Sequence, residues 1–505
     1  MEKRIRRLGI FMLLCFVALF LQLNNIQVLK ANSLANSPLN PRILTAERSQ
    51  TRGSILSSDG TVLASSVLAP KGSLDKYQRK YNTNTATLFA QIIGFDSDIY
   101  GNYRGIEAEY NSFLTPHTPP AKTLRDLLTN RTEVDNVTLT VNENLQLQVA
   151  EALDEHAAGV NGAAAVVYNP TTGAIEAMYS NPSFDPNPLV SQNSKVQNLA
   201  WAAYLNQPGN PLVAGAYDLT YPPGSSFKVV TTSAVLEHRP DLALMNYPVV
   251  PFITLPNTGN PAQQLTNYHS TPCGGNLEEL VIQSCDADFA SIGQQLGAQA
   301  LVTQAEDYGF NQQIPLDVPA DTVATSNFGT VADFADDVPG LMKSAIGQEN
   351  VTASALQMAL VAGTVANGGV EMVPHLMEQI RDSQGNLVET YQPKEWMQPI
   401  SPQTAATLTT FMKGVVTSGT AAPSASFSGF PPSWDVAAKT GTAQTGSFGP
   451  NPQYTDDWLI AFAPVGNTKV AIAVVLPDQP GSATGAAYSG PIVRQILGDV
   501  LADQG

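Results

Sequence analysis

The chain is poor in the residues that hold metal ions and in those that bind nucleic acids. Its 505 residues include five histidines and three cysteines, and the histidines are scattered without metal-ligand spacing. Lysine and arginine total 26 against 43 aspartates and glutamates, which gives a formal net charge of −17. No basic surface is available to neutralise phosphates. We therefore expect no metal, no cofactor and no nucleic-acid partner.

Charge itself is scarce, at 14% of residues, while 43% are hydrophobic. This composition is typical of a folded chain and excludes a disordered one. The length allows two to four domains of ordinary size.

One long apolar run lies near the N-terminus, over residues 8–23, and it extends less cleanly to residue 29. Lys3, Arg4, Arg6 and Arg7 precede it, and positive charge there keeps the N-terminus in the cytoplasm. A spanning helix needs about 20 residues, and no small-x-small cleavage site follows the run. We expect a cytoplasmic tail over 1–7, a single-pass transmembrane anchor over 8–28 and an extracytoplasmic remainder. A cleaved signal peptide is the alternative.

Two cysteines, Cys273 and Cys285, follow the apolar run. An extracytoplasmic compartment permits disulfides, and a bridge between these two would close a short loop. Two free thiols are the alternative.

The pattern of apolar residues predicts an α+β fold. Asp59-Gly60 between two short apolar stretches predicts a hairpin, and a polar region with mixed strands and helices continues to about residue 135. Beyond it, strands are expected near both ends of the remaining chain with helices between them. The expected strands are 137–141, 162–168, 174–179, 435–438, 458–463 and 470–476, and the expected helices lie over 144–156, within 226–367 and over 491–502.

A serine and a lysine three residues apart, Ser225 and Lys228, follow the sequence Tyr-Pro-Pro-Gly. On the first turn of a helix this spacing points both side chains the same way, so the amine could take the proton of the serine hydroxyl. The helix N-terminus would also aim backbone N–H groups at a forming oxyanion. A second Ser-x-x-Lys, Ser73 to Lys76, lacks the Pro-Gly approach and is interpreted as surface.

The triplet Lys439-Thr440-Gly441 follows two alanines of an expected strand and precedes Thr442. The missing side chain of Gly441 would let a substrate lie against the strand edge, and Lys439 supplies positive charge for a carboxylate.

Ser-x-x-Lys followed far downstream by Lys-Thr-Gly is the signature of penicillin-binding proteins and serine β-lactamases. Over nearly its whole length the sequence resembles a class B penicillin-binding protein, in the pattern of actinobacterial penicillin-binding protein A and the FtsI-like peptidoglycan D,D-transpeptidases. Ordered pieces that support the resemblance are Arg52-Gly53, Gly105-Ile106-Glu107, Pro182-Ser183-Phe184-Asp185-Pro186-Asn187, Ile346-Gly347-Gln348 and Ala366-Asn367-Gly368-Gly369.

The resemblance implies a linker and non-catalytic pedestal (dimerisation-like) domain over 29–140 and a penicillin-binding transpeptidase domain over 141–505, an antiparallel sheet with helices. It implies that Ser225 attacks a D-Ala-D-Ala stem peptide, releases D-Ala and passes the acyl group to a neighbouring stem peptide, in division or growth. Lys228 would be the base. Lys439, Thr440, Gly441 and Thr442 would bind substrate, with the backbone N–H groups of Ser225 and Thr442 as the oxyanion hole. β-Lactams would acylate the same serine.

The family's third element, Ser-x-Asn, is altered here. The position that fits is Ser284-Cys285-Asp286, and the resemblance implies that Ser284 shares protons with Lys228 and Lys439. An ionised aspartate only accepts hydrogen bonds, whereas asparagine also donates. Pairing of Asp286 with Lys228 is expected to raise the pKa of the lysine and weaken it as a base.

Alternative functions share the same residues. A D,D-carboxypeptidase or β-lactamase-type hydrolase would transfer the acyl group from the serine to water. A β-lactam sensor would be acylated and would then signal. A catalytically weak scaffold would depend on neither acylation nor acyl transfer. The resemblance also implies a membrane glycosyltransferase of the SEDS kind as partner, because class B proteins do not polymerise glycan.

Overall fold

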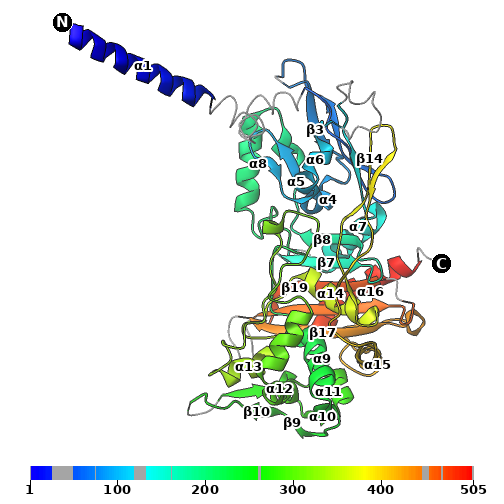
Figure 1. Cartoon of the computed structure of the whole chain (residues 1–505). Helices are drawn as coiled ribbons and strands as arrows, with labels where there is room; N and C mark the ends of the chain where they lie inside the picture. The colour runs from blue at the N-terminus through cyan, green and yellow to red at the C-terminus, as the bar shows by residue number, and fades with distance from the viewer. Residues whose placement is uncertain are drawn as a thin grey trace.

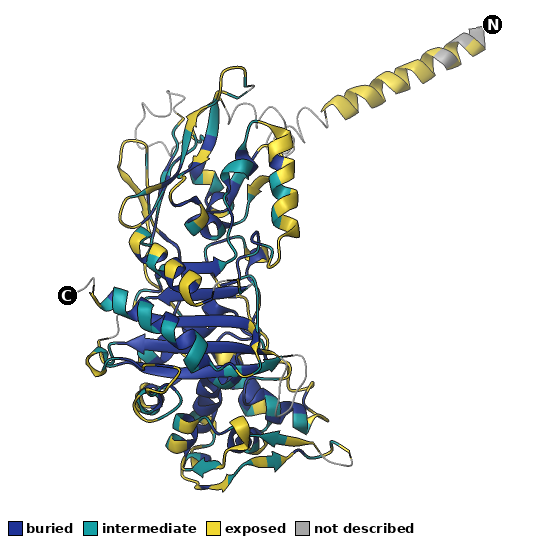
Figure 2. Cartoon of the chain, turned by 180° about the vertical axis from the view of Figure 1, so that it is seen from behind, coloured by how far each residue is buried: buried dark blue, intermediate teal, exposed yellow. Residues whose placement is uncertain are grey.

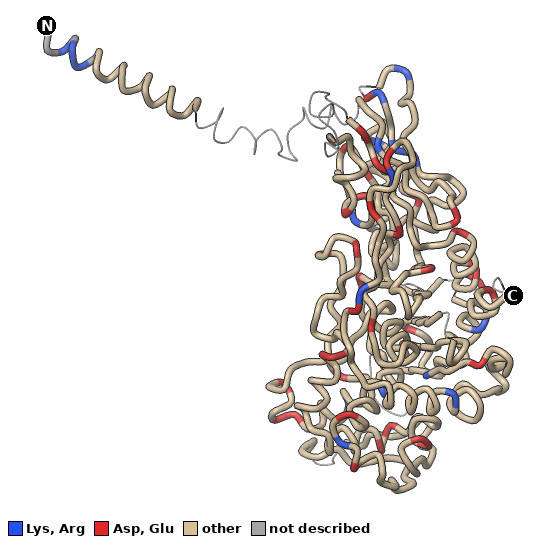
Figure 3. Tube along the Cα trace, turned by 45° about the vertical axis from the view of Figure 1, so that its right-hand side comes forward, with Lys and Arg blue, Asp and Glu red and all other residues tan. Residues whose placement is uncertain are grey.

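The computed structural model describes residues 2–24, 49–73, 75–118, 132–157, 159–160, 162–259, 263–445, 454–467 and 470–502. Beyond the N-terminal helix the molecule is elongated, with a sheet-based N-terminal domain, a second sheet in the middle and a helical lobe at the far end (Figure 1). Beyond the N-terminal helix, acidic positions occur throughout the trace (Figure 3).

The predicted anchor falls partly on α1, Glu2–Asn24. Its large apolar side chains are exposed, with Phe16 at 69% and Phe20 at 67%. Among the described residues, no helix has the combined length and hydropathy of a membrane span. Residues 25–28 of the predicted anchor lie outside the described part of the chain.

A six-stranded mixed sheet forms the N-terminal domain, with the predicted Asp59-Gly60 hairpin joining two of its strands. Gly60 has a φ of +87°, which suits a glycine turn. The hairpin strands pair antiparallel, while β1 and β6 pair parallel. In spatial order the strands are β15 (Leu387–Thr390), β14 (Met377–Arg381), β6 (Asn136–Leu139), β1 (Ile55–Leu56), β2 (Val62–Leu68) and β3 (Tyr77–Tyr81). Smaller elements complete the domain: α4 (Ala86–Ile93), β4 (Phe95–Ser97), β5 (Gly101–Tyr103), α5 (Gly105–Glu109) and α6 (Asn111–Leu114).

Strands β14 and β15 come from the C-terminal half of the chain but extend the N-terminal sheet (Figure 1). Asp317, also from that half, ties the junction: it accepts hydrogen bonds from the backbone N–H of Leu376 at 2.6 Å and Met377 at 2.8 Å, and from the Tyr110 hydroxyl at 2.8 Å. The two domains therefore share a sheet, which nothing in the sequence pattern indicated.

The middle of the molecule is a five-stranded antiparallel sheet whose strands come from the beginning and the end of the chain beyond residue 140, as predicted. Strands β7, β18 and β19 are buried along nearly their whole length, because α14 (Ala355–Ala366) packs on one face and α7 (Glu143–His156) and α16 (Gly485–Ala502) on the other (Figures 1 and 2). The order is β17 (Ala437–Thr445), β18 (Tyr454–Ala463), β19 (Val470–Pro480), β7 (Ala163–Tyr168) and β8 (Ile175–Asn181), so β17 is an edge strand. The α+β prediction is confirmed.

A helical lobe lies below the open edge of β17 (Figure 1). Its helices include α9 (Lys228–His238), α11 (Leu277–Gln283), α12 (Asp286–Asp307), α13 (Val338–Ser344) and α15 (Pro402–Thr417). Short strands flank them: β9 (Tyr247–Val250), β10 (Phe252–Thr254), β11 (Gln264–Thr266) and β12 (Cys273–Gly275). Within the lobe α9 packs on α12, and α15 packs on β17. The lobe is therefore in direct contact with the edge strand of the central sheet.

A buried ion network holds the N-terminal domain together. The carboxylate of Glu107, fully buried on α5, accepts from Arg52 at 2.7 Å, from Arg79 at 2.6 Å and from the Tyr81 hydroxyl at 2.9 Å. Burial acts to raise the pKa of Glu107, but the two guanidiniums outweigh it and hold that pKa below its ordinary value.

Glu107→Ala is expected to lower the free energy of unfolding by about 3 to 5 kcal/mol, because the buried guanidiniums of Arg52 and Arg79 lose the carboxylate that both contact and Arg52 keeps only Asp96, at 3.8 Å. Urea denaturation followed by circular dichroism measures this. Glu109→Ala, on the same helix but exposed, is the matched control and is expected to change stability little. Equal effects of the two variants would contradict the stabilising role of the network.

Candidate active site

Ser225 lies in a one-turn 3-10 helix, Gly224–Phe227, that leads directly into α9. Gly224 has a φ of +52°, and a Cβ there would lie 2.7 Å from the carbonyl carbon of Thr442. Its N–H donates to the carbonyl of Gly347 at 2.8 Å. The Pro-Gly approach is therefore a tight turn pressed against β17, and no larger residue fits at Gly224.

Strand β17 meets this turn at its own glycine. A Cβ on Gly441 would lie 2.5 Å from the carbonyl oxygen of Pro223. On the neighbouring strand, the Trp458 indole N–H donates to the carbonyl of Pro222 at 2.8 Å. The Lys-Thr-Gly triplet and the serine turn, distant in sequence, are thus in backbone contact.

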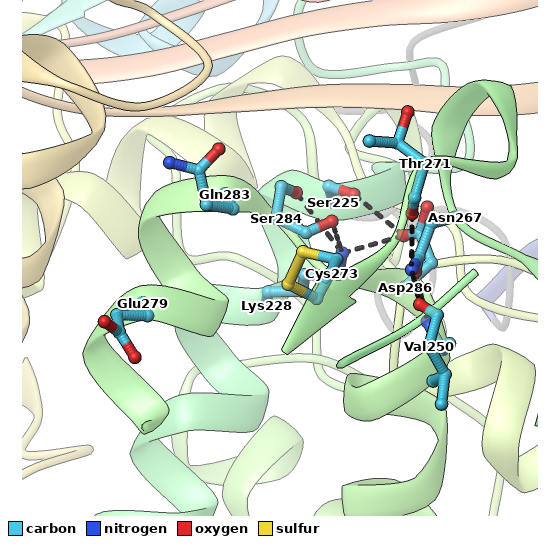
Figure 4. The surroundings of a disulfide bond; sticks show 12 residues. Ser225, Lys228, Val250, Asn267, Thr271, Cys273, Glu279, Gln283, Ser284 and Asp286 are labelled. Atoms are coloured by element: carbon cyan, nitrogen blue, oxygen red, sulfur yellow. Dashed lines mark hydrogen bonds and ion pairs between the residues drawn. A yellow bond between two sulfur atoms is a disulfide. The ribbon is translucent and has the colours of Figure 1, made fainter. Parts of the chain in front are cut away.

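Ser284 connects the two lysines. It ends α11 in the left-handed conformation, with a φ of 61°. Its hydroxyl lies 3.2 Å from Lys228 Nζ and 2.9 Å from Lys439 Nζ, and its carbonyl accepts from Lys228 at 2.8 Å. Both lysine side chains are fully buried. Figure 4 shows Ser225, Lys228, Ser284 and Asp286 converging on one point.

Asp286 begins α12 and faces the serine and the lysine together. One carboxylate oxygen, Oδ1, accepts from Lys228 Nζ at 2.7 Å and from the Ser225 hydroxyl at 3.3 Å. The predicted pairing of Asp286 with Lys228 is therefore present.

The pairing was expected to raise the pKa of Lys228, but burial outweighs the effect of Asp286. Burial, the largest influence, lowers the pKa of Lys228, and Asp286 acts in the opposite direction without reversing the net shift. Burial and the charge of Lys228 hold the pKa of Lys439 well below its ordinary value, again against Asp286. Burial therefore makes the neutral form of each amine more accessible than in an exposed lysine, despite the aspartate.

A disulfide fixes the segment that carries Ser284 and Asp286. Cys285, between them, is bonded to Cys273 on β12, with 5.5 Å between the Cα atoms. Of the two alternatives for these cysteines, the bridge is the one that forms, directly beside Lys228 (Figure 4).

The remaining predicted substrate residues have hydroxyls that already contact neighbouring elements. Thr440 Oγ1 lies 2.6 Å from the Thr420 hydroxyl, and Thr442 Oγ1 accepts from the N–H of Gly485 at the start of α16 at 3.1 Å. In contrast, Ser73 and the exposed Lys76 lie between β2 and β3, in the N-terminal domain.

Sequence reasoning assigned no role to Trp458, Gly347 or Thr420. The Ile346-Gly347-Gln348 piece was noted only as part of the resemblance, although Gly347 supports the serine turn through its carbonyl. The aromatic Trp458 in an expected strand gave no sign that its indole reaches Pro222.

Known proteins match both domains of the chain. The model of the penicillin binding protein transpeptidase domain matches residues 163–498, and that of the penicillin binding protein A dimerisation domain matches residues 52–137. The chain is 34% identical over 508 aligned residues to the peptidoglycan D,D-transpeptidase PbpA of Mycobacterium tuberculosis, covering 98% of each. The PbpA of Mycolicibacterium smegmatis is also 34% identical, over 99% of each chain.

The chain belongs to the penicillin-binding protein family. Solved structures agree: the penicillin G acyl-enzyme complex of M. tuberculosis penicillin-binding protein A has a TM-score of 0.78 and 32% identity, over 90% of this chain and all of that one. The imipenem acyl-enzyme complex of the same protein gives the same values. Penicillin-binding proteins with a conventional Ser-x-Asn carry a neutral amide where this chain has Asp286.

Asp286→Asn is expected to lower the pKa of Lys228 further, because the substitution removes the carboxylate that opposes the effect of burial most strongly, ahead of Asp288. NMR titration of lysine side chains labelled with 13C at Cε measures the shift. Asp241→Asn, which breaks an exposed pair with Arg239, is the control and should leave Lys228 unchanged. An unchanged or raised Lys228 pKa in Asp286→Asn would show that the pair does not set the lysine's charge.

Proposed function

We propose that this penicillin-binding protein is a serine-type peptidoglycan D,D-transpeptidase. The observation that carries the proposal is a chain of contacts between four separate elements. The Ser284 hydroxyl lies within hydrogen-bond distance of Lys228 and Lys439, and Asp286 Oδ1 accepts from both Lys228 and the Ser225 hydroxyl. Support also comes from the relatives named D,D-transpeptidase and from the acyl-enzyme complexes of the structural neighbours.

In the first step Ser225 attacks the penultimate D-Ala carbonyl of a stem peptide, and Lys228 takes the hydroxyl proton. A lysine is a base only when neutral, and burial makes that form accessible. Asp286 Oδ1 lies within reach of both groups, so it can orient the hydroxyl and the amine together. The backbone N–H groups of Ser225 and Thr442 are the proposed donors to the oxyanion.

The tetrahedral intermediate collapses when the bond to the terminal D-Ala breaks. The leaving amine needs a proton, and Lys228 can return it directly or through the Ser284 hydroxyl. An amine of a second stem peptide then attacks the acyl-enzyme, loses a proton to the same base and frees Ser225. Lys439, with Thr440 and Thr442 at the open edge of β17, is proposed to hold the terminal carboxylate. A β-lactam would acylate Ser225 by the first step alone.

Ser225→Ala is expected to abolish covalent labelling of the protein by a fluorescent penicillin, because the acyl-accepting oxygen is gone. Labelling is read by gel fluorescence and intact mass over several hours. Ser73→Ala, in the other Ser-x-x-Lys, is the matched control and should label as the unmodified protein does. Rapid loss of label from the unmodified protein would favour a hydrolase, and no label at all would favour a catalytically weak scaffold.

We also propose a membrane location, with residues 8–28 as a single-pass anchor, residues 1–7 in the cytoplasm and the catalytic domain outside. The four basic residues ahead of the apolar run and the exposed apolar side chains of α1 support it. A SEDS-type glycosyltransferase in the same membrane is the proposed partner, and its activity would supply glycan for cross-linking during division or growth.

One fractionation experiment addresses both proposals. The chain without residues 2–28 is expected in the soluble fraction, whereas the full chain and its Ser225→Ala variant are expected in membranes together with the partner. Deleting residues 40–135 should abolish co-purification of the partner while the label at Ser225 is retained. Soluble full-length chain would refute the anchor, and retained co-purification would refute the role of the N-terminal domain.

A further inference from the structure

Three potential metal ligands meet just before the start of β6 in the N-terminal domain. His117 and Glu133 face each other in an isolated antiparallel bridge, with backbone hydrogen bonds of 3.0 and 2.9 Å, and Asp135 immediately precedes β6. One ligand atom from each side chain lies within 4.8 Å of the other two. The backbone alone therefore brings one imidazole and two carboxylates together.

The imidazole of His117 is oriented as a ligand. Its Nδ1 lies 3.0 Å from the carbonyl oxygen of Thr115, which can only accept, so Nδ1 carries the hydrogen. In the neutral ring Nε2 then presents a lone pair, and it faces Asp135 Oδ2 at 3.3 Å. Two acceptors at this distance require a proton or a metal cation between them. A backbone carbonyl on the far nitrogen is the usual support of a metal-bound histidine.

Asp135 adds an independent observation. Its side chain is 2% exposed, and within the described structure the other oxygen, Oδ1, is buried without a hydrogen-bond partner. A buried carboxylate oxygen without a partner is costly. The backbone of Asp135 is held in place, because its N–H donates to the carbonyl of Phe113 at 2.9 Å and a Cβ on Gly53 would lie 1.8 Å from its carbonyl oxygen.

We propose that His117, Glu133 and Asp135 bind a divalent transition-metal ion, with Zn²⁺ as the fitting cation. One imidazole nitrogen and two carboxylates are a ligand set that zinc accepts, with water in the fourth position. Calcium and magnesium favour sets made of oxygen alone. The ion would link the segment around His117 to the start of β6. That strand begins at Asn136, which pairs with Arg381 of β14.

The site was missed in the sequence because His117 and Glu133 are 16 residues apart, outside the short spacings of common zinc motifs. The competing explanation is a protonated His117 paired with Asp135 and no metal. The two explanations differ in whether the chain binds Zn²⁺ and in whether Glu133 is required for that binding.

Isothermal titration of ZnCl₂ into the full, tag-free chain in detergent tests the proposal. One ion per chain is expected to bind and to raise the melting temperature. His117→Ala and Glu133→Gln should each weaken binding at least about a hundredfold, as expected for loss of a ligand. His238→Ala, which removes an exposed histidine elsewhere, is the control and should bind as the unmodified chain does.

Absence of binding to the unmodified chain, or equal binding by Glu133→Gln, would overturn the proposal in favour of the proton-linked pair. If circular dichroism shows that His117→Ala does not fold, the absorption spectrum of bound Co²⁺ is compared between the unmodified chain and Glu133→Gln instead. Tetrahedral d–d bands in the unmodified chain that are lost in Glu133→Gln support the site, and their absence from both refutes it. Penicillin labelling at Ser225 reports separately on the catalytic domain.

Discussion

Two lysine side chains are buried within hydrogen-bond reach of the Ser284 hydroxyl, and the rest of the site is arranged around the cost of their charge. Two ammonium groups so close together in a buried site would repel each other and lose their hydration. Asp286 offsets one positive charge, and burial lowers the pKa of both amines. This lowering makes the neutral amine, which is the form that a base requires, more accessible than in an exposed lysine.

The site keeps this geometry only if the backbone segments that carry its residues are held in fixed positions. The Cys273–Cys285 disulfide fixes the backbone between Ser284 and Asp286, while the contact of Gly224 and Gly441 with opposing backbone holds the serine turn against β17. Trp458 adds a third tie through the carbonyl of Pro222. The disulfide closes a short loop, whereas the contacts of Gly224, Gly441 and Trp458 join segments remote in sequence. The geometry of the site is therefore a property of the folded lobe and sheet together.

The N-terminal domain is joined to this unit by shared structure. Strands β14 and β15 leave the catalytic domain, and β14 pairs with β6 and is anchored at its start by Asp317. A sheet that crosses the boundary resists hinge motion better than a polar interface would, because bending it would break main-chain hydrogen bonds. The N-terminal domain can thus position the catalytic domain relative to whatever holds the N-terminus.

By itself the sequence determined the local chemistry: the helix start at Ser225, the strand with Lys439 and the hairpin at Asp59-Gly60 follow from short patterns whose physics is local. The order of strands and helices along the chain predicted the α+β class. The resemblance added Ser284 and Asp286 as members of one site. Only the tertiary structure decided that burial outweighs Asp286 in the pKa of Lys228, that the cysteines are bridged, that β14 crosses to the other domain, and that His117 meets Asp135. Desolvation and long-range pairing depend on neighbours brought from far along the chain, and no local pattern encodes them.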